Sequence, residues 1–143
     1  MHTAAFALLA ALAGPQVADL HAQHGHRTDP APSAAVAAVP RTPLGDRISA
    51  AAAGDTIRLA AGVHRGPILI DRPVTLLGED GATIDGGGTG SVVIMTGDAS
   101  ALVGITVGNG GRSLDRDDAG VKLIGCDGCT VRDVRVRQTL HGI

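Results

Sequence analysis

The clearest pattern in the chain is a set of apolar positions that repeats between residues 91 and 136. Each copy reads as apolar–x–apolar, a polar or glycine turn, one apolar residue, a second turn, and apolar–x–apolar again. Alternation over three to five residues is typical of strands rather than helices. A fixed period in this range indicates stacked structural repeats. The positions that recur 29 residues later are Val92, Ile94, Leu102, Ile105 and Val107, which correspond to Val121, Leu123, Val131, Val134 and Val136.

The same pattern extends in both directions with shorter spacings. Towards the N-terminus, Leu76 corresponds to Leu102, and Ile84 supplies a third apolar position of an earlier repeat. Towards the C-terminus, Gly142-Ile143 resembles Gly120-Val121. The spacing varies in the loops, as expected where strands stack and loops face solvent.

These repeats predict an all-β fold, a parallel β-helix of about three rungs over residues 44–143. Connections between parallel strands of one sheet are almost always right-handed, so we expect a right-handed solenoid. The segments 66–71, 91–96 and 119–125 should stack in one parallel sheet, with three side chains aligned inside it, those of Ile70, Ile94 and Leu123.

Residues 44–53 are predicted to form a short N-terminal capping helix, and residues 56–59 to form the first strand. Pro43 suits the first turn of a helix, and Gly54 is expected to act as its C-cap. Leu44 and Ile48 fall on one face of this helix. A solenoid needs such a cap because its first rung otherwise exposes apolar side chains and unpaired backbone groups.

Residues 1–22 resemble a secretion signal, and residues 23–43 a linker rich in His, Ala and Pro. The apolar run 4–14 is too short to span a membrane, and cleavage is expected after Ala18 or Ala22. We therefore expect a periplasmic protein that is not embedded in the membrane. Such a protein would fold in an oxidising compartment.

The composition argues against two classes of binding surface. The net charge is −2, so nothing indicates nucleic acid as a partner. One Phe, no Tyr and no Trp leave no aromatic platform for single-stranded nucleic acid or for sugars.

Several polar clusters are candidates for ligand binding. The histidines of the tract 21–26 could capture a divalent metal or belong to a mobile polar tail. His64 is either a ligand or base, or a solvent-facing turn residue. The loop 113–118 gathers Asp115, Asp117 and Asp118, which could hold calcium, serve acid–base chemistry on a sugar, or form a solvated loop.

Cys126 and Cys129 are the only cysteines and flank Asp127-Gly128 in a predicted turn. One interpretation is a disulfide that closes the turn after export. A second is a pair of thiolates that binds copper(I), with His141 as a conceivable third ligand. A third is a redox couple, which lacks a helix N-terminus nearby to stabilise a thiolate.

The chain also resembles a known family. The succession GDTI, GVHRG, IDRP, IDGGG, NGGRSL and DAGV, within residues 44–143, is similar to the N-terminal part of the NosD-like periplasmic β-helix proteins. These belong to the wider group of carbohydrate-binding and sugar-hydrolase β-helix modules. The resemblance implies a parallel β-helix that acts with the permease and ATPase of an ABC-type transporter. It also implies a role in maturing the copper centres of nitrous-oxide reductase. Family members have many more rungs, so we read this chain as the N-terminal part of such a β-helix.

The resemblance favours a non-catalytic accessory protein that handles copper and contacts nitrous-oxide reductase or a copper chaperone. The alternative is a polysaccharide-acting β-helix enzyme, such as a polygalacturonase or lyase, or a carbohydrate-binding module. Asp117-Asp118 and His141-Gly142 resemble the paired aspartates and the His-Gly motif of polygalacturonase-like hydrolases. Their upstream Asn-Thr-Asp is replaced here by Thr96-Gly97-Asp98, so we assign no catalytic residue.

Overall fold

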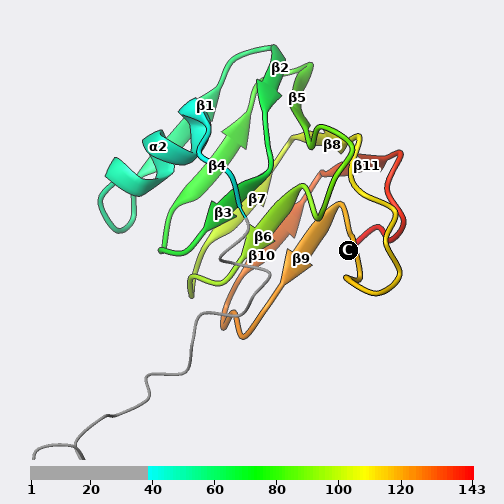
Figure 1. Cartoon of the computed structure of the whole chain (residues 1–143). Helices are drawn as coiled ribbons and strands as arrows, with labels where there is room; N and C mark the ends of the chain where they lie inside the picture. Colours follow the sequence, from blue (N-terminus) through cyan, green and yellow to red (C-terminus); the bar gives the residue numbers. More distant parts are fainter. Residues whose placement is uncertain (1–38) are drawn as a thin grey trace, which may run out of the picture. The chain divides into compact units, whose positions relative to one another are not determined.

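The computed structural model describes residues 39–143, which form a parallel β-helix preceded by one short helix (Figure 1). The predicted secretion signal and the histidines at positions 21, 24 and 26 lie outside these residues. The helix and strands are α2 (Pro43–Ala50), β1 (Thr56–Leu59), β2 (Gly62–Arg65), β3 (Ile68–Ile70), β4 (Thr75–Gly78), β5 (Ala82–Asp85), β6 (Val93–Met95), β7 (Ala101–Val103), β8 (Thr106–Gly108), β9 (Val121–Leu123), β10 (Thr130–Arg132) and β11 (Arg135–Arg137).

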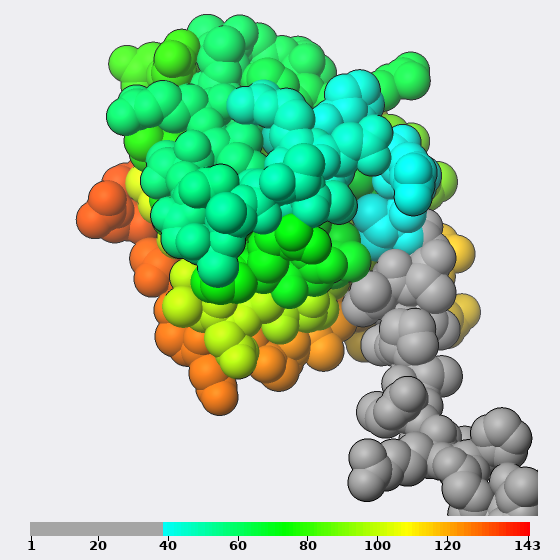
Figure 2. All heavy atoms as spheres, turned by 90° about the vertical axis from the view of Figure 1, so that its left-hand side faces the viewer, coloured from blue at the N-terminus to red at the C-terminus, as the bar shows by residue number. Residues whose placement is uncertain are grey.

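The strands form three sheets, and each turn of the chain contributes one strand to each sheet. Sheet A has the order β1-β4-β7-β10, sheet B the order β2-β5-β8-β11, and sheet C the order β3-β6-β9. Every strand pair in these sheets is parallel. Figure 2 shows the turns layered in sequence order, from cyan through green and yellow-green to orange. The predicted fold class, a parallel β-helix of about three rungs with an N-terminal capping helix, is confirmed.

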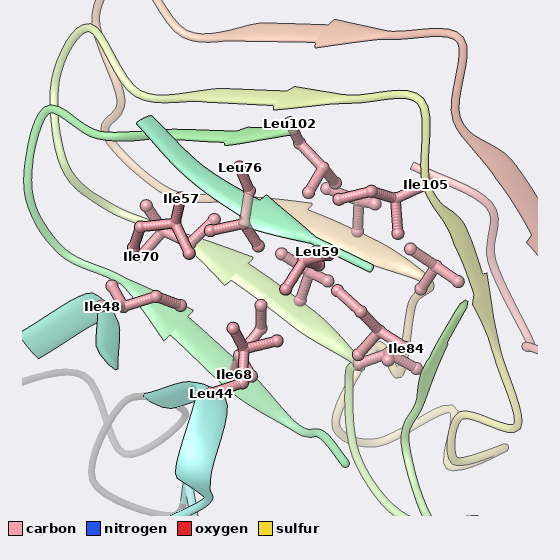
Figure 3. Close-up of a cluster of buried hydrophobic side chains, with 14 of the residues drawn as sticks. Leu44, Ile48, Ile57, Leu59, Ile68, Ile70, Leu76, Ile84, Leu102 and Ile105 are labelled. Atoms are coloured by element: carbon pink, nitrogen blue, oxygen red, sulfur yellow. The ribbon is translucent and has the colours of Figure 1, made fainter. Parts of the chain in front are cut away.

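The core is a narrow column of aliphatic side chains that stack from one rung to the next. In sheet A, Ile57 pairs with Leu76, and Leu76 with Leu102. In sheet B, Ile84 pairs with Val107. The side chains of Ile57, Leu76, Leu102 and Ile84 point towards the axis between the sheets (Figure 3). Leu76, Ile84, Leu102 and Val107 have no exposed surface, and each such burial stabilises the fold by about 1.5–3 kcal/mol.

Helix α2 packs over the first rung with Leu44 and Ile48 buried against the core (Figure 3). Thr42 is its N-cap, because its Oγ1 accepts a hydrogen bond from Gly45 N at 3.0 Å. Pro43 occupies the first turn, as predicted.

The predicted C-terminus of this helix was wrong: α2 ends at Ala50 rather than near residue 53. The Arg72 guanidinium donates to Ser49 O at 2.6 Å and to Ala51 O at 3.2 Å, which satisfies carbonyls at the end of the helix. Gly54 is not the C-cap. It has φ of 86° in the turn before β1, where its N–H donates to Pro73 O.

The three segments predicted for sheet C do stack in parallel, but one predicted alignment was wrong by one residue. Ile70 pairs with Met95, and Met95 with Leu123. Ile94 pairs instead with Leu69 and Lys122, on the outer face of the sheet. A slip of one residue along a strand exchanges its two faces. The turn 96–100 is one residue shorter than its counterpart 124–129, so between β6 and β9 sheet C repeats after 28 residues, whereas sheets A and B repeat after 29 in the same step.

Candidate functional site: the cysteine turn

Cys126 and Cys129 lie in the turn that leads from β9 in sheet C to β10 in sheet A. This turn stacks on the turn 96–100 of the preceding rung, between β6 and β7. Gly125 and Gly128 have φ of 54° and 67°, in the left-handed region that glycine adopts most readily. Both cysteines of this turn face the rung above.

The two sulfurs form a disulfide in the structure, with 5.9 Å between the Cα atoms. Both side chains are half-buried. Ser100 Oγ lies 3.2 Å from Cys129 Sγ and 3.9 Å from Cys126 Sγ. Gly97 O lies 3.2 Å from Cys129 Sγ and 3.4 Å from Cys126 Sγ. The pair thus faces one hydroxyl and one carbonyl of the rung above it.

The cysteine turn is held against the turn above by two further hydrogen bonds. Asp127 N donates to Asp98 Oδ1 at 2.9 Å, and Ala99 N donates to Asp127 O at 2.8 Å. Gly97 packs against the backbone of Asp71 and Arg72 so closely that an added Cβ would overlap both residues. The corner is a stack of three turns in close contact, and it fixes the position of the cysteines.

His141, the conceivable third copper ligand, lies at the opposite end of β9. It forms a parallel bridge with Ala119, which precedes β9, whereas Cys126 follows β9. Its N–H donates to Asp118 O at 3.2 Å, and its carbonyl accepts from Gly120 N at 2.9 Å. The structure therefore brings Cys126 and Cys129 together but does not bring His141 to them. Within residues 39–143, no three His, Cys, Asp or Glu side chains gather closely enough to hold a metal ion.

The carboxylates of the acidic loop do not converge on one point. Asp118 is 1% exposed, and its Oδ2 accepts a hydrogen bond from Ser113 N at 2.9 Å within the loop. Asp117 is exposed, and its carbonyl, like that of Arg116, accepts a hydrogen bond from Lys122 Nζ. These contacts fold the loop against the outer face of sheet C. A cavity of about 510 Å³ there is lined by Val39, Pro40, Pro67, Thr89, Gly90, Ser91, Ile94, Asp115, Arg116, Asp118 and Lys122.

His64 lies on β2 in the first rung, in register with Ile84 of the next rung. Its ring Nε2 lies 2.9 Å from Ala60 O, within hydrogen-bond distance, and the side chain is half-buried. It is a strand residue whose ring contacts the preceding turn, not a residue of the turn itself.

Sequence reasoning missed two polar residues that the structure makes prominent. Ser100 is 1% exposed and faces the cysteines; the signal was its position 29 residues before Cys129, the repeat length. Asp85 accepts hydrogen bonds from Gly87 N at 2.7 Å and from Asn109 Nδ2 at 2.8 Å. The signal for Asp85 was an aspartate before three glycines, a sequence that suits an Asx turn.

The pKa of Asp85 is lowered from its ordinary value of 3.8, chiefly by the hydrogen bond from Gly87 N–H and then by that from the Asn109 amide. A lowered pKa in the folded state stabilises the fold above the unfolded pKa, and this contribution is lost as pH falls through the folded pKa. We therefore expect Asp85→Asn to be less stable than wild type at neutral pH, with a difference that shrinks below pH 3.8.

Urea unfolding of both proteins from pH 7 down to pH 2 tests this expectation. Asn109→Gly is the matched variant, because glycine accepts the φ of 54° at this position while removing the amide donor. It should reduce the pH dependence without abolishing it. A stability difference between wild type and Asp85→Asn that stays constant over this range would contradict the expectation.

No helix in the described part of the chain is long and apolar enough to cross a membrane.

Comparison with known proteins gives one partial match. A segment of 63 residues is 43% identical to the "Probable ABC transporter binding protein NosD" of Pseudomonas aeruginosa. The matched segment is 44% of this chain and 15% of that protein, so the chain spans a small part of the relative's length. No family model matches the chain. No solved structure matches it either.

Proposed function

We propose that this chain is part of a NosD-type periplasmic accessory protein that acts with an ABC-type transporter in maturing the copper centres of nitrous-oxide reductase. The observation that carries the proposal is the match of 43% identity to a NosD protein. The parallel β-helix agrees with the fold that the family resemblance implies. The proposal assigns the chain a structural and cargo-handling role and no catalytic residue.

The placement of the acidic residues weighs against the polysaccharide-acting alternative. Hydrolysis of a glycosidic bond needs two carboxyl groups on either side of one scissile bond. Asp98 lies at the cysteine corner, in contact with Asp127 N. Asp118 and His141 lie at the other end of β9.

Copper enters the proposal as cargo held by the cysteine pair in its reduced form. Two thiolates are the soft ligands that copper(I) prefers. The turn already brings both sulfurs together at a half-buried corner. His141 lies at the other end of β9 and does not join them, and in this proposal a partner protein supplies the third ligand. A copper chaperone or nitrous-oxide reductase could take the ion from a complex in which copper(I) is bound by the two cysteines and by a ligand of that partner.

Anaerobic titration of the reduced protein with copper(I), in competition with a chelator, tests this role. We expect the variant Cys126→Ser/Cys129→Ser to bind copper(I) more than roughly 100-fold more weakly than wild type. Loss of a residue that only hydrogen-bonds to a metal ligand costs roughly 10–100-fold, and loss of the ligands themselves should cost more. His141→Ala is the matched control and should leave the affinity unchanged, because His141 lies at the far end of β9.

An affinity that is unaltered in the double serine variant would show that the pair does not bind copper. The histidines at positions 21, 24 and 26 would then be the next candidates, and a variant that replaces them with alanine would test that.

A further inference from the structure

Two polar groups, the Ser100 hydroxyl and the Gly97 carbonyl, lie within hydrogen-bond distance of the cysteine sulfurs. Ser100 Oγ is buried and lies 3.2 Å from Cys129 Sγ. Gly97 O lies 3.2 and 3.4 Å from the two sulfurs. Within residues 39–143, neither the Ser100 hydroxyl nor the Gly97 carbonyl forms another hydrogen bond.

One donor and one acceptor match a thiol and a thiolate better than they match a disulfide. A thiol S–H can donate to Gly97 O, and a thiolate can accept from Ser100 Oγ. A disulfide sulfur has no hydrogen to donate and is a weak acceptor. Beside the oxidised pair, the Ser100 hydroxyl has only a weak sulfur acceptor and the Gly97 carbonyl receives no hydrogen bond from either sulfur, which has a free-energy cost. The Ser100 hydroxyl and the Gly97 carbonyl therefore shift the equilibrium of the cysteine pair towards its reduced form, compared with the same turn without these two groups.

We propose that Cys126–Cys129 is a redox-active pair that exchanges electrons with an external dithiol, and that Ser100 is its positioning residue. The pair lies at a corner of the solenoid where both side chains are only partly buried, so a reductant can reach it. In the reduced state the pair can bind copper(I), and in the oxidised state it cannot. This link to copper rests on the proposed function.

The exchange proceeds in two balanced steps. A thiolate of the external dithiol attacks Cys126 Sγ, a mixed disulfide forms, and Cys129 leaves as a thiolate. Cys129 is the leaving sulfur because Ser100 Oγ lies nearer to it, at 3.2 Å against 3.9 Å for Cys126. The second thiol of the reagent, as a thiolate, then attacks its own mixed-disulfide sulfur and releases Cys126. Two electrons and two protons pass from the dithiol to the cysteine pair, and the dithiol becomes a disulfide.

The measurement is the equilibrium of the purified chain with mixtures of reduced and oxidised dithiothreitol, followed by alkylation and mass analysis. We expect wild type to interconvert reversibly between the two states. Ser100→Ala should shift the equilibrium about tenfold towards the disulfide, which is about 30 mV for a two-electron couple. Ser100→Thr keeps the hydroxyl and should return the equilibrium towards the wild-type value.

Ser91→Ala is the matched control. Ser91 is the other buried serine of the described residues, and its Oγ accepts a hydrogen bond from Ala119 N at the opposite end of β9. It should destabilise the fold and leave the redox equilibrium unchanged, which separates a redox role from a structural one. Cysteines that excess dithiol cannot reduce, or an equilibrium that Ser100→Ala leaves unchanged, would overturn the proposal. Copper(I) affinity is measured separately on the reduced protein, so failure to bind copper would count against the proposed function alone.

Discussion

Leu102→Ala is expected to lower the free energy of unfolding by about 2–5 kcal/mol, a large share of the roughly 5–15 kcal/mol that typically stabilises a domain. Leu102 has no exposed surface and lies in the middle of the sheet A column, between Leu76 above and Val131 below. Strands above and below hold its neighbours in place, so the cavity cannot close by local collapse. Equilibrium unfolding in urea, monitored by circular dichroism, measures the change.

Leu114→Ala is the control for this prediction. Leu114 is 70% exposed in the loop beside sheet C, so its replacement should change stability by less than about 0.5 kcal/mol. Equal losses for the two variants would mean that the stacked aliphatic column does not dominate the stability of the fold.

Gly97→Val is expected to destabilise the protein by about 1–3 kcal/mol or more, and to disturb the cysteine turn as well. An added Cβ would overlap backbone atoms of Asp71 and Arg72, which cannot move aside as a flexible side chain could. The turn that carries Gly97 would have to separate from the turn above it. Since the Gly97 carbonyl contacts both sulfurs, the cysteine pair would shift too.

Thermal unfolding, together with the rate of reduction of the disulfide by dithiothreitol, measures both effects. Gly142→Val is the control, because a Cβ at Gly142 meets no atom within 4 Å. A Gly97→Val protein with wild-type stability would show that the stacked corner tolerates a wider spacing than the structure indicates.

The parallel stacking of the last two rungs could be predicted from the sequence because sheets A and B both repeat there after 29 residues. Val131 and Val136 follow Leu102 and Val107 at equal spacing, and the structure pairs them as expected. The period of strand side chains is two, so apolar–x–apolar positions identify the inner face once the spacing is right. The register of sheet C could not be predicted in the same way, because a one-residue difference between turns moved Ile94 to the outer face.

The end of the helix was unpredictable for a different reason. Helix α2 stops where Arg72, from a turn distant in sequence, donates to the carbonyls of Ser49 and Ala51. A tertiary contact of this kind leaves no trace in the local sequence, whereas the Thr42 N-cap and Pro43 are local signals at the other end.

The candidate site was predictable only as far as it is local. The spacing of Cys126 and Cys129 around Asp127-Gly128 was enough to place both sulfurs together. The distance between the cysteines and His141 depends on which end of β9 each of them lies at. The pattern of apolar positions did not predict that His141 lies at the end opposite the cysteines. Ser100 became part of the site through stacking between rungs, which requires the register of the turns and not only of the strands.

The proposed role in maturing the copper centres of nitrous-oxide reductase can be tested by the copper content of that enzyme. Nitrous-oxide reductase would be purified from the host strain, from a strain that lacks the gene for this chain, and from the deletion strain complemented with the gene. We expect the deletion strain to produce the reductase polypeptide with its copper depleted, and the complemented strain to restore the copper. A reductase that carries its full complement of copper in the deletion strain would contradict the account.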